Sequence, residues 1–137
     1  MAGNKSQYLE NACLNWLKGS TFPAAPTTVY VALFTAAPSD SGGGTEVSGN
    51  AYARQAITTS SGWSAISGGG ASPEQISNAA TITFPTPTGN WGTVVAIGLF
   101  DAATNGNLLY WNTISSQAIN SGVVAYFAIG ALIVTDD

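Results

Sequence analysis

The first part of the chain repeats apolar residues at the spacing of an amphipathic helix. The residues at positions i, i+3, i+4, i+7 and i+8 are Leu9, Ala12, Cys13, Trp16 and Leu17. Asn4 can cap such a helix, with Gln7 three residues later. Gly19 then supplies a residue that readily adopts the left-handed conformation at which helices end. The pattern therefore predicts one helix at residues 5–18.

From residue 28 onward the apolar pattern changes to a period of two, with many β-branched and aromatic residues, which is typical of strands. The run Thr28–Thr35 is apolar on both faces, so we expect a central strand that is covered on each side. Further strands are predicted at Tyr52–Thr59 with an extension at Gly62–Ile66, and at Ile76–Phe84, Trp91–Phe100, Leu108–Ile114 and Val123–Val134. The last of these should bend near Gly130.

Segments rich in Gly, Pro and Ser separate the predicted strands. Residues 36–50 and 67–73 should be loops, and Asn105-Gly106 marks the turn of a β-hairpin. Since no helical pattern lies between the strands, they should pair mainly antiparallel. We predict a single domain at residues 1–137 that is mainly β. The N-terminal helix should precede an antiparallel β-sandwich or jelly-roll-like body of seven or eight strands at residues 28–135.

The composition is unusually poor in ionisable groups. Charged residues make up 7% of the chain, against about 25% in ordinary domains. A surface made polar by Ser, Thr, Asn and Gly loses little hydration when a partner covers it, which suits a subunit of an assembly. The three cations, Lys5, Lys18 and Arg54, are scattered along the chain, which argues against nucleic-acid binding.

Membrane and secretion signals are also missing from the sequence pattern. The longest apolar stretches are too short or too interrupted to span a bilayer, and residues 1–19 lack the hydrophobic centre of a signal peptide. We therefore expect no membrane contact and synthesis in the cytosol without secretion.

The residue types present exclude the commonest catalytic designs. The chain has no His, so neither a Ser/His/Asp system nor imidazole metal ligands can form. Cys13 is predicted to be a small buried hydrophobe rather than a reactive thiol, because no imidazole is available to lower its pKa. Asp40 lacks neighbours at the spacing of a calcium loop. We predict no catalytic residue, no cofactor and no metal.

Two acids, Glu46 and Asp101, stand at positions that suggest a role. Asp101 follows an apolar strand and precedes the hairpin turn, where Asp side chains commonly bond nearby backbone N–H groups. Glu46 precedes Arg54 across a short turn, which predicts a structural ion pair that fixes the geometry of the loop. A polysaccharide-cleaving enzyme that uses paired carboxylates remains an alternative.

The aromatic residues lie within strand or helix patterns, which favours core or subunit-interface packing over a sugar-binding platform. The residues proposed for an interface are Trp16, Tyr52, Trp63 and Trp91.

Several sequence segments, in this order and spacing, resemble a family of small bacteriophage virion proteins. The segments are YLENACLNWLKG at 8–19, VYVALFT at 29–35, GTEVSGNAYARQ at 44–55, ITFP at 82–85, WGTV at 91–94, IGLFDA at 97–102, GNLLY at 106–110 and GAL at 130–132. Members are often labelled phage tail fibre proteins, and similar small β-sandwich proteins serve as capsid decoration, or cement, proteins. The resemblance implies a virion protein without catalytic residues.

The chain lacks shaft repeats, heptads or collagen-like tracts that would extend a fibre. We therefore expect a head decoration protein that binds the major capsid protein and copies of itself, as a trimer or dimer. The helix should either cover the sandwich, which is the default, or grip the capsid. The alternatives are a tail or tail-fibre component that contacts a host receptor, and a polysaccharide-binding module or depolymerase with a host surface glycan as its ligand.

Overall fold

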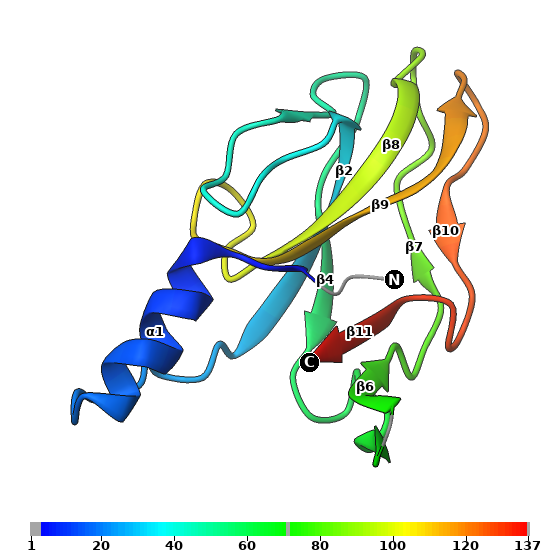
Figure 1. Ribbon diagram of the computed structural model, residues 1–137. Helices are drawn as coiled ribbons and strands as arrows, with labels where there is room; N and C mark the ends of the chain where they lie inside the picture. The colour runs from blue at the N-terminus through cyan, green and yellow to red at the C-terminus, as the bar shows by residue number, and fades with distance from the viewer. Residues whose placement is uncertain (1–3, 71, 137) are drawn as a thin grey trace.

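A computed structural model, which describes residues 4–70 and 72–136, shows a mainly β fold with one helix near the N-terminus (Figure 1). The predicted fold class is thereby confirmed. The helix α1 spans Gln7–Leu17. The strands are β1 Asn4–Lys5, β2 Thr28–Ala36, β3 Thr45–Glu46, β4 Gln55–Thr58, β5 Ser67–Gly69, β6 Ser72–Ser77, β7 Ile82–Thr83, β8 Gly92–Phe100, β9 Leu108–Ile119, β10 Tyr126–Phe127 and β11 Ile133–Asp136.

The largest sheet is built around the two apolar runs that the sequence marks most clearly. Its order is β1-β9-β8-β2-β3, with β4 also paired to β2, and all of its pairs are antiparallel. β8 and β9 form the predicted hairpin, and both Asn105 and Gly106 have the positive φ that its turn requires. β2 lies inside the sheet and is buried on both faces, with Val31 and Leu33 on one side and Phe34 on the other.

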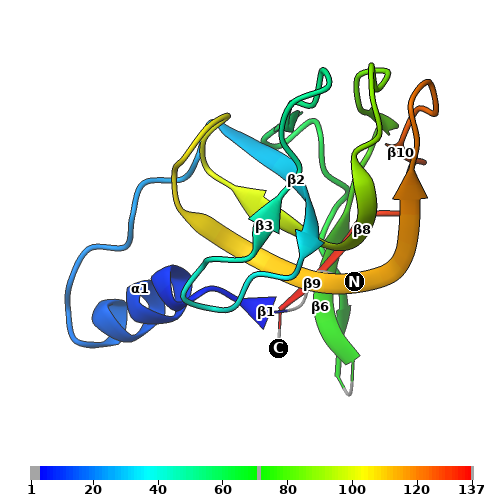
Figure 2. The same cartoon turned by 90° about the horizontal axis from the view of Figure 1, so that it is seen from above.

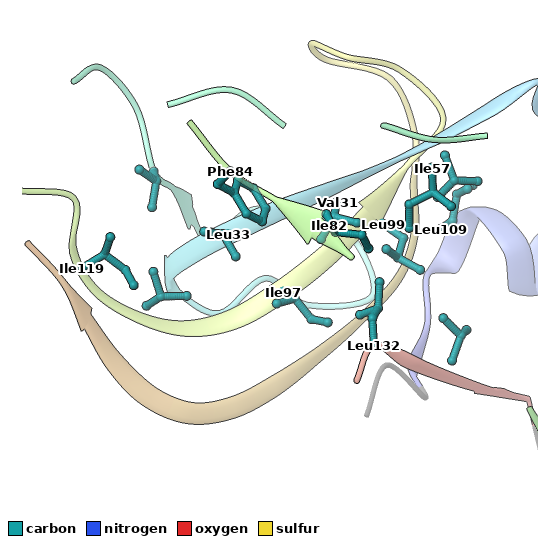
Figure 3. Close-up of a cluster of buried hydrophobic side chains, with 14 of the residues drawn as sticks. Val31, Leu33, Ile57, Ile82, Phe84, Ile97, Leu99, Leu109, Ile119 and Leu132 are labelled. Atoms are coloured by element: carbon teal, nitrogen blue, oxygen red, sulfur yellow. The ribbon is translucent and has the colours of Figure 1, made fainter. Parts of the chain in front are cut away.

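Two small sheets, β7-β10 and β5-β6-β11, lie against one face of the large sheet (Figure 1). Apolar residues from all three sheets meet there in one core, part of which Figure 3 shows. The buried members of this core are Val29, Val31, Leu33, Val47, Ile57, Ile82, Phe84, Trp91, Val94, Ile97, Leu99, Leu109, Ile119, Leu132 and Val134. The alternating pattern of the sequence thus supplies one continuous layer between sheets.

The described residues form eleven strands, more than the seven or eight predicted. Two predicted long strands are each broken in two, and the short strands β1, β3 and β5 form in segments predicted to be helix or loop. The break in Ile76–Phe84 falls at Asn78, whose side chain is buried. Its Oδ1 accepts the backbone N–H of Leu132, and its Nδ2 donates to the carbonyls of Ala80 and Ala128. This amide holds both broken strands in a corner, and Gly130 turns within the second one with a φ of 78°.

Several predicted boundaries are also wrong. The helix cap is Ser6, whose hydroxyl accepts the N–H of Leu9, while Asn4 belongs to β1 and pairs with β9. Residues 52–54 and 62–66 are not strands, and the predicted loop at 67–73 contains β5 and the start of β6. β9 continues to Ile119 because an irregularity in its pairing with β8 lets it bend and continue.

Figures 1 and 2 show α1 at the periphery of the molecule, beside the sheet and not over its centre. Its first turns pack on the body through Ala12, which is buried, and Leu9, which is partly buried against the core. Its last turn extends beyond the body, so Leu14, Trp16 and Leu17 are exposed at 60%, 61% and 75%. The expectation that the helix covers the sandwich is therefore only partly met.

Candidate functional site

Glu46 and Arg54 lie together at the end of the large sheet, as the sequence suggested. Arg54 Nε donates to Glu46 Oε1 and Nη2 donates to Oε2, each at 2.8 Å. This fork-to-fork geometry is the strong form of an ion pair. The side chain of Arg54 is only 7% exposed and that of Glu46 26%, so the pair is largely removed from water.

Strand pairing and turn conformation position the two residues. Glu46 belongs to β3 and pairs with Phe34 of β2. The chain then turns through Gly49, Asn50 and Ala51, all of which have positive φ, and this reversal returns Arg54 to the same place. Positive φ is favourable for Gly and tolerated by Asn, which accounts for the Gly-Asn pair at this turn.

Arg54 also connects two loops. Its Nη1 donates to the carbonyl oxygens of Ala102 and Asn105, at 2.9 and 2.8 Å, in the loop between β8 and β9. Its guanidinium carbon lies 3.7 Å from the centroid of the Phe100 ring, a cation–π contact. One side chain thus holds the β3–β4 loop against the tip of the β8–β9 hairpin.

Tyr52 is the third polar residue of this cluster. Its hydroxyl donates to Glu46 Oε1 at 2.9 Å and accepts the backbone N–H of Leu33 at 3.0 Å. Its ring stacks on Phe84 and meets the edge of Trp91. Burial in this apolar setting raises the pKa of the Tyr52 hydroxyl well above its ordinary range. We call Glu46, Tyr52, Arg54 and Phe100 the loop clamp.

Three further carboxylates are also engaged by neighbours. Asp101 Oδ1 accepts the backbone N–H of Asn107 and Oδ2 accepts its side-chain amide, which closes the hairpin loop. Asp40 Oδ1 accepts the indole N–H of Trp111 at 2.8 Å. Asp136 pairs with Lys5 at 2.7 Å, and this hydrogen bond raises the pKa of Lys5. These contacts give each of the three acids a partner within the fold.

A polar hollow of about 580 Å³ lies over the loop clamp, between the start of α1, the loop at 41–44 and the hairpin loop. Its walls are main-chain groups and uncharged side chains apart from Asp40, Glu46 and Arg54. Within residues 4–70 and 72–136, no three His, Cys, Asp or Glu residues are grouped to hold a metal ion.

The four aromatic residues proposed for an interface have different positions. Trp91 is 5% exposed and donates its indole N–H to the Asn50 carbonyl, so it is a core residue. Tyr52 is turned inward as described, and Trp63 is partly buried against the core. Only Trp16 is largely exposed. The proposal of an interface is therefore corrected for Trp91 and Tyr52, whose rings other parts of the same chain already cover.

Two prominent features of the structure were not predicted from the sequence. One is the buried corner amide of Asn78, for which a single sequence carries no signal because two of its three partners, Ala128 and Leu132, lie 50 and 54 residues away. The other is the exposed Leu14, which shares a helix face with Leu17, three residues later. The spacing of Leu14 and Leu17 was present in the sequence, but the sequence did not say which apolar face of the helix the body would cover.

Within the described part of the chain, no helix has the length and apolar composition needed to cross a membrane. No curated protein matches the sequence. A family model described as podophage GP4 fiber I protein gp80 matches residues 4–135.

Proposed function

The chain belongs to the podophage GP4 fiber I protein gp80 family, and on that premise we propose that it is a non-enzymatic structural subunit of a phage fibre. The membership confirms the resemblance to small phage virion proteins and makes the chain a fibre-type virion protein. The match runs from the first residue of β1 to residue 135 within β11, so the family relationship covers nearly the whole described fold and not an attached segment. This extent is the observation that carries the proposal.

The place on the particle is the part of the proposal that has changed. The sequence favoured head decoration, because no shaft repeat is present. The matched family is described as a fiber protein, which favours the alternative of a tail-fibre component. The curved large sheet, with the two small sheets against one face, suits a compact knob or joint of a fibre better than an extended shaft (Figures 1 and 2). Head decoration remains a prediction that competes with this proposal.

The state of the acidic groups supports a structural role. Glu46 is bound by Arg54 and Tyr52, and Asp101 closes a hairpin loop. A glycosidase needs one carboxyl group to protonate the leaving group and a second one to act as base or nucleophile. Carboxylates that are held by internal hydrogen bonds and a bidentate Arg are poorly placed to exchange protons with a substrate. We therefore propose that these residues hold loops in place.

The arrangement of aromatic rings also disfavours a carbohydrate-binding module. A sugar platform needs exposed ring faces, but Trp91 is in the core and Trp63 packs partly against it. The loop clamp instead stiffens the β3–β4 loop and the hairpin tip. Rigid loops suit a subunit that must present one fixed surface to neighbouring proteins.

The test is to locate and count the protein in the particle. A small epitope tag at the C-terminus, detected by labelled antibody in electron micrographs, gives the place, and quantitative mass spectrometry of purified particles gives the copy number. We expect label on the tail apparatus and a few tens of copies or fewer. Label spread over the head, with hundreds of copies, would reject the fibre proposal and favour decoration. Absence from the particle would reject both.

A further inference from the structure

The helix α1 has a second face that the β body leaves exposed, although Glu10 and Leu14 border a hollow that they share with Lys5, Asp40 and Asp136 of the body. Its inner face carries Leu9 and Ala12, which pack on the core side. Positions 10, 14, 17 and 18 follow the i, i+4, i+7, i+8 spacing of a single helix face. They hold Glu10, Leu14, Leu17 and Lys18, all exposed. We call these four residues the outer stripe.

The two charges of the outer stripe have no partner within the described residues. The chain has three cations; Lys5 pairs with Asp136 and Arg54 with Glu46. The remaining cation, Lys18, and the exposed Glu10 are in neither pair. A negative charge near the helix start and a positive charge at its end suit the helix dipole. The dipole does not explain the two largely exposed leucines between them.

The order of residues in the outer stripe is self-complementary. Glu10 lies four residues before Leu14, and Lys18 lies four residues after it. If two copies of α1 lie antiparallel with their Leu14 residues facing each other, Glu10 of each copy is placed opposite Lys18 of the other. The two Leu14 side chains then meet at the middle of the contact, each Leu17 lies opposite Asn11 of the other copy and beside its Leu14, and the two charge pairs lie at the ends.

We propose that the outer stripe binds the same stripe of a second copy of this chain, as an antiparallel helix pair with two-fold symmetry. Leu14 would then lose most of its exposed apolar surface and Leu17 part of it, and this burial is the driving force. The helix pair adds one contact between copies to the proposed function. It rests on that function only for where in the particle the two copies meet.

The size of the stripe sets the expected strength of the pair. A contact of about two helical turns falls short of the roughly 1,200 Å² that stable complexes bury. We therefore expect a concentration-dependent equilibrium between monomer and dimer in solution. In a particle, where other contacts hold copies close together, the same weak pairing becomes effective through its high local concentration.

The first test changes the apolar centre of the stripe. Sedimentation equilibrium of the full chain, over a roughly hundred-fold concentration range, should show a dimer that grows with concentration. Leu17→Glu should raise the dissociation constant by about ten-fold or more, because it buries a charge against the partner. Ile66→Glu is the matched control, since Ile66 is 73% exposed and lies outside the helix. It should leave the constant unchanged, and circular dichroism should show both variants folded.

The second test exchanges the charges. Glu10→Lys and Lys18→Glu should each weaken the dimer by about three- to ten-fold, because each single change places like charges opposite each other at both ends of the contact. The double variant Glu10→Lys/Lys18→Glu should restore wild-type affinity to within about two-fold. Only an antiparallel arrangement centred near Leu14 predicts this rescue.

Three outcomes would overturn the pairing: a chain that stays monomeric at every concentration, a dimer that tolerates Leu17→Glu, or a double variant that is no better than the single ones. A monomeric protein that is nevertheless found on the fibre would refute the helix pair and leave the proposed function intact. A dimer with the predicted rescue, in a protein that is absent from the particle, would support the helix pair and refute the proposed function.

Discussion

The coupling between Glu46 and Arg54 can be measured, and it should be large for a pair of charged residues. The perturbation is Glu46→Gln, which keeps the shape of the side chain and removes its charge. One of the two oxygens that Arg54 contacts at 2.8 Å is then replaced by an NH₂ group. Two donors cannot face each other at that distance, so one bond of the fork is lost.

The magnitude follows from the burial of the arginine. Loss of one partner of a buried pair typically costs about 3–5 kcal/mol. Glu46 is one quarter exposed, so water can partly replace it, and the two carbonyl partners and the Phe100 ring continue to stabilise the guanidinium. We expect Glu46→Gln to lower the free energy of unfolding by about 2–3 kcal/mol. Arg54→Met, which keeps the stem over the ring, should cost a similar amount.

The assay is a double-mutant cycle in urea, followed by tryptophan fluorescence, since the buried Trp91 reports on the core. The double variant Glu46→Gln/Arg54→Met should be less destabilised than the sum of the single variants by about 2 kcal/mol. The pair Lys5 and Asp136 is the matched control. Its side chains are 26% and 53% exposed, so its coupling should be below about 1 kcal/mol. A coupling for Glu46 and Arg54 no larger than that of the control would refute the argument.

Three further predictions concern the core and the pH dependence of stability. Asn78→Ala leaves the buried N–H of Leu132 without its acceptor and should lower the free energy of unfolding, measured in urea, by about 2–4 kcal/mol. The control Asn90→Ala removes one exposed hydrogen bond and should lower it by less than about 1 kcal/mol, so equal losses would contradict the role of the corner amide. Gly98→Ala places a methyl group 2.9–3.2 Å from three apolar side chains and should lower the free energy of unfolding by about 1–3 kcal/mol. The thermal unfolding midpoint should therefore fall, and an unchanged midpoint would contradict the prediction. Burial raises the pKa of Tyr52 above its ordinary value of 10.0, so the folded protein holds this proton more tightly than the unfolded chain, and the contribution to stability is complete below pH 10 and is lost above it. The free energy of unfolding, measured in urea, should therefore fall between about pH 8 and about pH 11, and it should fall less for Tyr52→Phe over the same interval.

Local patterns were sufficient for the elements whose cause is local. The spacing of Leu9, Ala12 and Trp16 predicted the helix, because a helix is set by side chains three and four residues apart. The two-sided apolar run at Thr28–Thr35 predicted the inner strand β2, and Asn105-Gly106 predicted the hairpin turn. The scarcity of ionisable groups and the family resemblance indicated a structural virion protein before any coordinates were known.

The features that depend on distant partners required the tertiary structure. The sequence suggested that Arg54 pairs with Glu46, eight residues away, but its contacts with Ala102 and Asn105 exist only because β3 and the β8–β9 hairpin end at the same edge of the molecule. In the same way, Asn78 breaks a strand pattern through partners that the fold brings from the far end of the chain.

The helix shows the boundary between the two kinds of information. Its sequence determined that it forms and that apolar residues line it, because propensity and spacing act within the helix itself. How much of it the β body covers was decided by where the body ends, and this leaves Leu14 and Leu17 in water. Burial depends on neighbours that only the folded chain supplies. A sequence pattern alone therefore could not distinguish the inner face, which packs on this molecule, from the outer stripe. We propose that the outer stripe packs on a second molecule.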